Sequence, residues 1–176
     1  HFGHQGTACL DLEGKKLWEN RSLVYHPQHG NGASPILVDG KLVFSCDGRD
    51  EQFVAALKAS DGSLAWKFTR PTHAKSKFAS TVINVAGRDQ IISPGADMVN
   101  ALEPATGKEI WRADYEGYSI VPKPVFGDGL VYISSAFDTP EVLGIDPTGK
   151  GTVTDTHVKW VETKYAPKTP SMIFDN

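Results

Sequence analysis

Tryptophan recurs along this 176-residue chain with a nearly constant period, at intervals of 48, 45 and 49 residues. The first three tryptophans each stand four residues after a glycine, in the segments Gly14–Trp18, Gly62–Trp66 and Gly107–Trp111. A period of this length indicates an array of similar units, each of which buries its apolar face only against its neighbours. The repeat therefore constrains the fold more than the activity, because the repeating residues are those that every unit needs in order to fold.

Each repeat contains two predicted hairpins. The hairpin that ends at tryptophan begins with a short apolar segment, found at 8–11, 55–58, 100–103 and 143–146. A second hairpin has its turn at Asp39-Gly40, Ala86-Gly87 and Gly127-Asp128-Gly129 in successive repeats. Glycine supplies the positive φ of tight turns, and no segment shows a capped helical period. The sequence thus predicts an all-β protein, a β-propeller of four-stranded antiparallel blades with little or no helix.

Strand counting predicts a single domain over residues 1–176 with about four blades' worth of strands. The expected units are a partial blade at 1–22, blades at 30–70, 76–115 and 119–164, and the first strand of a further blade at 168–176. A propeller that closes by pairing strands from its two termini divides one blade in this way. The last full unit carries an insertion at 152–157, which we expect to lengthen one hairpin at the rim.

Composition argues against some classes of partner. The net charge of −3, the isoelectric point near 6.1 and the scattered basic residues give no surface for nucleic acid. No apolar run is long enough for a transmembrane helix. The two cysteines, Cys9 and Cys46, belong to no metal-ligand motif, so we expect thiols in strands, with a disulfide between them as the alternative.

The segment Asn100–Trp111 resembles the tryptophan-docking repeat of the pyrroloquinoline-quinone-type (quinoprotein-like) β-propellers. That family includes the quinoprotein alcohol dehydrogenases and the propeller lipoprotein of the outer-membrane assembly machinery. The resemblance implies seven or eight blades, so that this chain is part of a propeller or a half that dimerises, and a periplasmic, cell-envelope or secreted location. It also implies structural docking residues that clamp each blade onto the next, namely Trp18, Trp66, Trp111, Trp160, Gly14, Gly62 and Gly107.

Polar residues at or before each first strand are candidates to line the channel or a ligand mouth. These ligand candidates are His29, Asn31, Lys77, Tyr118 and Lys123, and the simpler interpretation is that they are solvated loop residues. Three aspartates, Asp47, Asp97 and Asp138, follow the second strand of their units. Such carboxylates commonly bond turn amides, and calcium binding is the alternative.

Two hypotheses for function follow. The first is a noncatalytic propeller scaffold that binds a protein partner, a second copy of the chain or a small ligand at its face or channel. The alternative is part of a dehydrogenase acting on alcohols or sugars with pyrroloquinoline quinone and calcium. For that enzyme the resemblance implies an adjacent cysteine pair, which this sequence lacks. We therefore favour the scaffold and assign no catalytic residue. A glycan-cleaving propeller has no paired-carboxylate signature here.

Overall fold

The structure, a computed structural model, describes residues 1–27, 34–71, 81–135 and 137–175. Regular structure in these residues is nearly all β. The exceptions are a short 3-10 helix, η1 (Gly3–Gln5), and a single-turn helix, α1 (Thr154–His157). No helix among the described residues is long and apolar enough to cross a membrane. The prediction of an all-β chain with little helix is confirmed.

The strands form four sheets, which we number in chain order. Sheet 1 holds β1 (Thr7–Leu10) and β2 (Lys16–Asn20). Sheet 2 holds β3 (Ile36–Val38), β4 (Lys41–Asp47), β5 (Gln52–Lys58) and β6 (Leu64–Thr69). Sheet 3 holds β7 (Thr81–Val85), β8 (Arg88–Pro94), β9 (Met98–Leu102), β10 (Glu109–Asp114) and the added β14 (Gly151–Thr152). Sheet 4 holds β11 (Val125–Gly127), β12 (Leu130–Ser134), β13 (Val142–Ile145) and β15 (Val158–Glu162).

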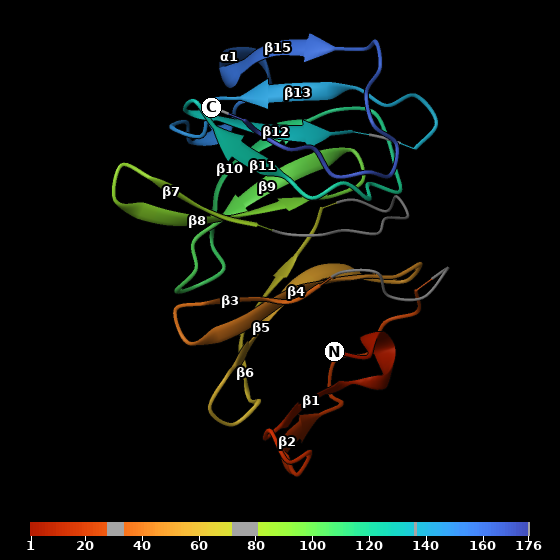
Figure 1. The fold of residues 1–176 in the computed structure, drawn as a ribbon, viewed down its shortest axis with the longest axis vertical. Helices are drawn as coiled ribbons and strands as arrows, with labels where there is room; N and C mark the ends of the chain where they lie inside the picture. The colour runs from red at the N-terminus through yellow and green to blue at the C-terminus, as the bar shows by residue number, and fades with distance from the viewer. Residues whose placement is uncertain (28–33, 72–80, 136, 176) are drawn as a thin grey trace.

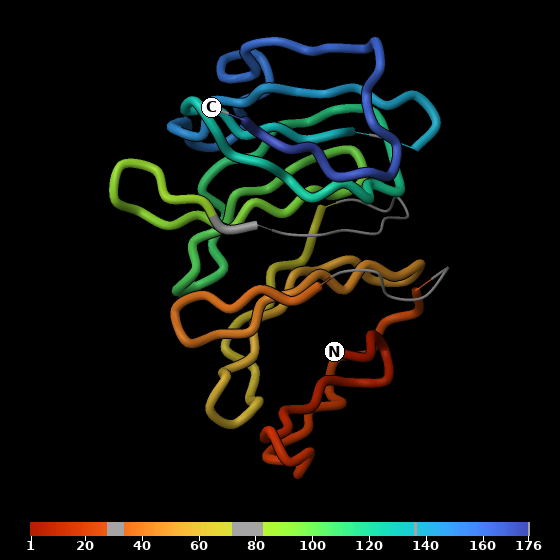
Figure 2. The backbone as a smooth tube through the Cα atoms, viewed as in Figure 1, coloured from red at the N-terminus to blue at the C-terminus, as the bar shows by residue number. Residues whose placement is uncertain are grey.

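The sheets succeed one another along the long axis of the molecule. In Figure 1 sheet 1 lies at the lower end, in red, and sheet 4 lies at the upper end, in blue. The backbone tube in Figure 2 shows each sheet as a meander that the chain completes before it enters the next one, apart from β14, which the chain adds to sheet 3 after β13. Four-stranded antiparallel meanders that succeed one another in this way are the blades of a propeller.

The turns between first and second strands explain why the hairpins form where the sequence predicts them. Both central residues have positive φ at Asp39-Gly40 (50° and 67°), Ala86-Gly87 (49° and 80°) and Asp128-Gly129 (45° and 75°). Two successive positive φ values match the right-handed twist of the flanking strands, and glycine adopts the second at no steric cost. The predicted turn positions of these three hairpins are confirmed.

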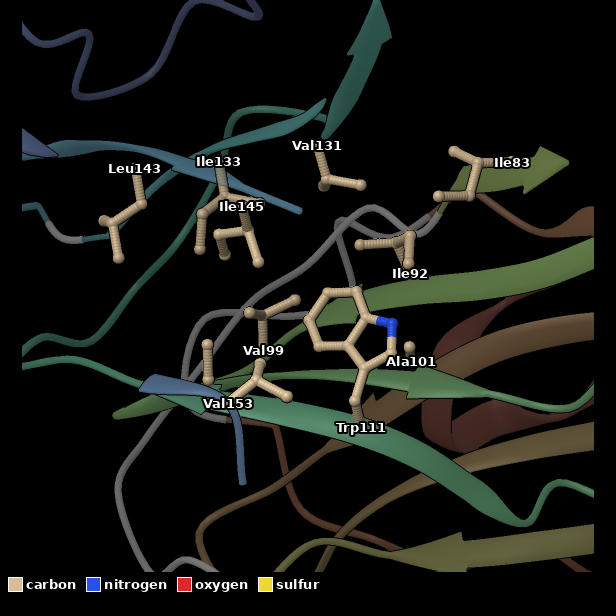
Figure 3. Close-up of a cluster of buried hydrophobic side chains, with 11 residues drawn as sticks. Ile83, Ile92, Val99, Ala101, Trp111, Val131, Ile133, Leu143, Ile145 and Val153 are labelled. Atoms are coloured by element: carbon tan, nitrogen blue, oxygen red, sulfur yellow. The ribbon is translucent and has the colours of Figure 1, made fainter. Parts of the chain in front are cut away.

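Apolar side chains fill the spaces between successive sheets. One cluster, around Tyr25, Phe44 and Phe53, lies against Trp18 and Leu23 from the end of sheet 1. A second joins sheets 2 and 3, and the third joins sheets 3 and 4. Figure 3 shows this third cluster, in which the fully buried Trp111 indole lies among aliphatic side chains of both sheets. The core is thus divided into layers, one for each pair of neighbouring sheets.

The insertion in the last repeat does more than lengthen a hairpin. It lies between β13 and β15, as predicted, but β14 pairs in parallel with β10 of the preceding sheet. The backbone N–H of Val153 donates to the carbonyl of Arg112 at 2.8 Å, and the Val153 side chain is buried beside Trp111. The insertion therefore covers the outer edge of sheet 3 and connects sheets 3 and 4.

The C-terminal segment differs from its prediction. We expected the first strand of a further blade at 168–176, and the described part of this segment contains no strand. Instead the Phe174 ring stacks on Tyr132 with ring centroids 5.8 Å apart, and it lies against Gly127. A strand needs a neighbour that pairs with it through backbone hydrogen bonds. Here the Phe174 side chain makes the contact with sheet 4.

Both cysteines are free thiols, so the disulfide alternative was wrong.

Candidate functional site

The predicted ligand residues that the structure describes lie at one edge of the stacked sheets. The turns after β4, β8 and β12 and the link from sheet 3 to sheet 4 gather on the right-hand side of Figure 1, opposite the tight hairpin turns. We call this side the loop face. Tyr118, Lys123, Asp47, Asp97 and Asp138 lie on or near it, whereas His29, Asn31 and Lys77 fall outside the described residues.

Tyr118 and Asp138 contact each other. The Tyr118 hydroxyl donates a hydrogen bond to the Asp138 carboxylate, and that charged acceptor raises the pKa of the tyrosine. The backbone N–H of Phe137 donates to the Tyr118 carbonyl at 3.1 Å, and the Lys168 ammonium lies 5.7 Å from the centroid of the Phe137 ring. Tyr118 and Phe137 are 45% and 44% exposed. We call Tyr118, Phe137, Asp138 and Lys168 the rim patch.

Asp97 and Lys123 have structural contacts. The Asp97 backbone has a positive φ of 62°, and its carboxylate accepts a hydrogen bond of 3.3 Å from the N–H of Gly117. Gly117 is 20 residues away in sequence, so this contact joins two segments, whereas we predicted bonds to nearby turn amides. The backbone N–H of Lys123 donates to the Ser171 hydroxyl at 3.0 Å, which ties the start of sheet 4 to the C-terminal segment, and the Lys123 residue is exposed.

Asp47 is buried between two sheets. Its Oδ1 accepts a hydrogen bond of 3.1 Å from Nε of Arg70, and the side chains of the two residues are 2% and 0% exposed. Its Oδ2 is buried without a hydrogen-bond partner among the described residues. Burial raises the pKa of Asp47 to about 6, against the opposing effect of the Arg70 charge. The Asp47–Arg70 pair is therefore part of a closed interior rather than of a solvent-open site.

Arg70 extends this polar contact into sheet 3. Its Nη1 donates to Oδ1 of Asn100 at 2.9 Å and to the carbonyl of Ser93 at 3.1 Å, and its Nη2 donates to Oγ of Ser93 at 2.7 Å. Asn100 in turn donates to Glu109 at 2.8 Å. We call Asp47, Arg70, Ser93 and Asn100 the junction cluster. Arg70 joins β4 of sheet 2 to β8 and β9 of sheet 3.

Sequence reasoning missed Arg70, although a signal was present. Phe44 pairs with Ala55 on the second and third strands of sheet 2, and Ile133 pairs with Leu143 on the same strands of sheet 4. The corresponding pair in sheet 3 is Ser93 with Asn100. Two polar residues at core positions require a buried polar partner, and Arg70 supplies it.

A second contact that sequence reasoning missed lies on the loop face next to sheet 2. Oδ1 of Asp50 accepts a hydrogen bond of 2.9 Å from the backbone N–H of His26, and Oδ2 lies 2.6 Å from Nδ1 of the His26 ring. These bonds lower the pKa of Asp50. Arg49 N–H donates to the His26 carbonyl at 2.9 Å, so the contact fastens the chain after sheet 1 to the turn after β4.

The three predicted metal aspartates do not converge. Asp47 pairs with Arg70, Asp97 with Gly117 and Asp138 with Tyr118. In the part of the chain that the structure describes, no three acidic, histidine or cysteine side chains are placed to hold one metal ion. The adjacent cysteine pair that the resemblance implies for a quinoprotein dehydrogenase is not formed by the two cysteines, which lie on separate strands, β1 and β4.

Two tryptophans bind the turn of the following sheet in the same way. Nε1 of Trp18 donates to the carbonyl of Ala59 at 3.0 Å, and three atoms of its ring lie within 3.0 Å of where a Cβ on Gly62 would stand. Nε1 of Trp66 donates to the carbonyl of Pro104 at 3.0 Å. Its ring covers Gly107 just as closely. Only glycine leaves room for the indole at these turns.

Trp111 and Trp160 depart from this pattern. Nε1 of Trp111 donates to Oε1 of Gln90 at 2.8 Å, and Nε2 of Gln90 donates to the carbonyl of Pro147 at 3.2 Å. Gln90 thus relays the bond to the turn of sheet 4, where the insertion follows. Trp160 lies against Gly144 of its own sheet and is 41% exposed.

Comparison with solved structures finds propellers. BamB from Moraxella catarrhalis matches with a TM-score of 0.58 and 16% identity, over 86% of this chain and 42% of its own length. Quinohemoprotein alcohol dehydrogenase from Comamonas testosteroni matches with a TM-score of 0.52 and 20% identity, over 75% of this chain and 21% of its own. A europium-containing methanol dehydrogenase matches with a TM-score of 0.51 and 16% identity, over 74% of this chain and 24% of its own.

These likenesses show the fold. The chain has the fold of the pyrroloquinoline-quinone-type β-propellers, as the tryptophan repeat predicted, and it spans less than half the length of the propellers that it matches. No family model matches the sequence, and no curated protein matches it. The structural neighbours include BamB as well as alcohol and methanol dehydrogenases, so the fold leaves function to the side chains.

Proposed function

We propose that this chain is part of a noncatalytic propeller scaffold that binds a protein partner through the rim patch on its loop face. The observation that carries the proposal is the pair of half-exposed aromatic rings, Tyr118 and Phe137, on loops that rigid strands position. Tyrosine and phenylalanine are enriched at the centres of protein interfaces. The other described candidate side chains have structural contacts or, like Lys123, present only an exposed charge.

The contacts within the rim patch also suit recognition. Asp138 holds the Tyr118 hydroxyl, and Phe137 bonds the Tyr118 backbone, so the two rings lose little freedom when a partner arrives. Lys168 and Asp138 add one charge of each sign beside the rings, which suits a partner segment with both apolar and charged side chains. A small ligand is the lesser candidate, because the patch is open to solvent rather than enclosed. By fold likeness we also propose a periplasmic, cell-envelope or secreted location.

Peptide selection tests the rim patch. A displayed library of random 12-residue peptides is selected on the immobilised chain, and the enriched peptides are measured against Tyr118→Ala and Phe137→Ala. Loss of an interface aromatic at a hot spot costs about 2 kcal/mol or more, so we expect affinity to fall at least about 30-fold on either variant. The control is Leu37→Ala, which removes a 69% exposed side chain of β3 outside the patch and should leave affinity unchanged.

Enriched peptides that bind both patch variants as tightly as the wild type would place recognition elsewhere and contradict the proposal. Circular dichroism checks that each variant keeps its β structure. Because all three residues are exposed, we expect melting temperatures within about 2 °C of the wild type, the range typical of surface substitutions.

A second candidate function is favoured by the likeness to two dehydrogenases. Both the quinohemoprotein alcohol dehydrogenase and the methanol dehydrogenase share the fold of this chain. Among the described residues the three aspartates lie apart and the cysteines lie on separate strands, so we derive no catalytic step from them. The test is reduction of an artificial dye by an alcohol in the presence of pyrroloquinoline quinone and calcium. We expect no turnover above the protein-free blank, and turnover that saturates with the quinone would replace the scaffold proposal.

A further inference from the structure

The outer edges of sheets 2 and 3 are built alike, but only one of them is covered. Sheet 2 lies between sheets 1 and 3, and sheet 3 lies between sheets 2 and 4 (Figure 1). Beyond its fourth strand, β10, sheet 3 continues to β14, which pairs in parallel with β10. Sheet 2 ends at its fourth strand, β6, and no strand among the described residues pairs with the outer side of β6. The difference therefore separates two inner sheets rather than an inner sheet from an end sheet.

The two outer strands correspond residue by residue. Trp66 of β6 pairs with Ala56 of β5, as Trp111 of β10 pairs with Ala101 of β9. In both sheets the register of this pairing shifts just before the tryptophan. Each residue after Trp66 is therefore equivalent to the residue at the same distance after Trp111.

The insertion supplies partners for the outer side of β10. The carbonyl of Arg112 accepts a hydrogen bond of 2.8 Å from the N–H of Val153. Two residues further along β10, the N–H of Asp114 donates to the Thr154 hydroxyl at 2.9 Å. Backbone groups of alternate residues point to the same side of a strand, so Arg112 and Asp114 mark the outer side of β10.

The same side of β6 has no such partners. The N–H of Arg70 donates to the carbonyl of Gln52 at 2.8 Å, so the backbone groups of Arg70 and Phe68 point to β5. Those of Lys67 and Thr69, in between, point outward. In the part of the chain that the structure describes, no residue bonds the backbone N–H or C=O groups of these two. Such a row of open donors and acceptors is a template for an added strand.

The side chains of β6 leave this edge open as well. Edge strands that do not pair commonly carry outward charges, but β6 contains one charged residue, Lys67, whereas β10 contains three. The Lys67 ammonium pairs with Glu51 at 2.6 Å and lies 4.0 Å from the centroid of the Phe53 ring. Both partners belong to β5 or to the turn before it, so the charge is held toward β5 and away from the outer edge.

The segment that covers β10 shows which side chains such an edge accepts. Residues 151–154 read Gly-Thr-Val-Thr and carry no charge. Threonine and valine are β-branched and favour an extended backbone. Beside β6 an apolar contact is also available, because Leu64 is 45% exposed. A segment of small, β-branched and uncharged residues therefore suits the edge of β6.

We infer that β6 accepts an extended segment of a partner protein, of small, β-branched and uncharged residues, as an added parallel strand. One N–H of the partner donates to the carbonyl of Lys67, as that of Val153 does to Arg112. Strand addition takes its affinity from main-chain hydrogen bonds and its specificity from alternate side chains. The rim patch contains no residue of sheet 2, so this surface is separate from it and does not depend on it.

Fluorescence polarisation tests the edge with a labelled peptide that has the sequence of residues 149–156. We expect saturable binding to the full chain. Lys67→Pro removes the outward N–H without removing a bond to β5, so affinity should fall at least about tenfold. Lys67→Ala keeps the N–H and is the matched control, with an affinity within about twofold of the wild type, because the exposed ion pair that it loses contributes little.

Two N-methylated peptides make the test independent of how any variant folds. Methylation at the valine blocks the N–H that corresponds to Val153, which donates to the neighbouring strand in β14. Methylation at the threonine just before it blocks an N–H that points away from that strand, since the direction alternates along the segment. We expect the first peptide to bind at least about tenfold more weakly than the second.

The outcomes that overturn the inference are specific. One is the absence of binding up to about 1 mM peptide. Another is an equal affinity of the two methylated peptides, or of the wild type and a folded Lys67→Pro chain. Light scattering identifies a second copy as the occupant: a dimer that Lys67→Pro separates into monomers would assign the edge to self-association instead. Circular dichroism checks the fold of each variant, and the methylated pair decides if Lys67→Pro does not fold.

Discussion

The junction between sheets 2 and 3 and the junction between sheets 3 and 4 each contain a tryptophan of the repeat, Trp66 or Trp111, but different contacts stabilise them. The first contains the junction cluster, in which the buried Arg70 bonds both sheets. In the second, Ile133 and Leu143 take the places of Ser93 and Asn100, and the contact is apolar around Trp111. A repeat therefore specifies where neighbouring sheets meet, and the residues between the repeated positions decide what holds them.

The two junctions also differ in how tryptophan reaches the next sheet. Trp66 bonds a turn carbonyl directly, whereas Trp111 does so through Gln90. The difference coincides with the insertion after Pro147, which sends β14 back to β10. The insertion also buries Val153 in the apolar cluster between sheets 3 and 4.

The largest effect is expected at the junction between sheets 3 and 4, which we call the apolar junction. Trp111→Ala removes a fully buried indole and should lower the free energy of unfolding by about 3–5 kcal/mol. Chemical denaturation followed by circular dichroism measures the loss. Trp160→Ala, with 41% of the residue exposed, should cost distinctly less. Equal losses would mean that burial between sheets does not distinguish the two tryptophans.

The next largest effect is expected at the junction between sheets 2 and 3, which we call the polar junction. Arg70→Met keeps much of the side-chain volume but leaves the Asp47 carboxylate buried without its cation, which should cost about 3 kcal/mol. The double variant Arg70→Met with Asp47→Leu removes both charges and should recover at least half of that loss, since apolar pairs often replace buried ion pairs without penalty. Denaturation midpoints of the three proteins give the comparison. A double variant less stable than Arg70→Met would show that the cluster is not simply an ion pair.

A smaller effect tests the relay at the apolar junction. Gln90→Leu leaves both Nε1 of Trp111 and the carbonyl of Pro147 buried without this partner, and we expect a loss of about 2 kcal/mol. Thermal unfolding measures it. The control is Asn84→Leu, whose exposed side chain donates to Asp89 and accepts from the N–H of Gly87, and which should change stability by no more than about 1 kcal/mol. An unchanged melting temperature for Gln90→Leu would show that the hydrogen bonds of Gln90 do not stabilise the junction between sheets 3 and 4.

The smallest effect is a dependence of the polar junction on pH. The pKa of Asp47 is about 6 in the folded chain, above its ordinary value of 3.8. A raised folded pKa makes the folded state the stronger proton binder, so this stabilisation is complete below pH 3.8 and is lost as pH rises through 6. Between pH 5 and 7 the loss should be about 1 kcal/mol. Asp47→Asn should flatten the slope, and an identical slope in both proteins would contradict the assignment.

The hairpins show how much could be predicted from sequence. A turn such as Asp128-Gly129 depends on two adjacent residues and their φ angles, which local chemistry decides. The tryptophan at the end of each repeat likewise marks where the fourth strand runs. Turn amides were the predicted partners of the three aspartates, whereas Asp97 bonds the N–H of Gly117 in another segment. Their individual partners, from Arg70 to Tyr118, could not be predicted, because each partner is 20 or more residues away in sequence.

The amino-acid sequence by itself determined the four-stranded unit, its period and the positions of its turns, because these depend on residues close together in the chain. Only the tertiary structure decided that Arg70 enters the core, that Gln90 relays the bond of Trp111 and that the insertion returns to β10. It also decided that Tyr118 and Phe137 form one exposed patch. These contacts join different sheets or loops, and packing of distant segments chooses among partners that local sequence leaves equally available.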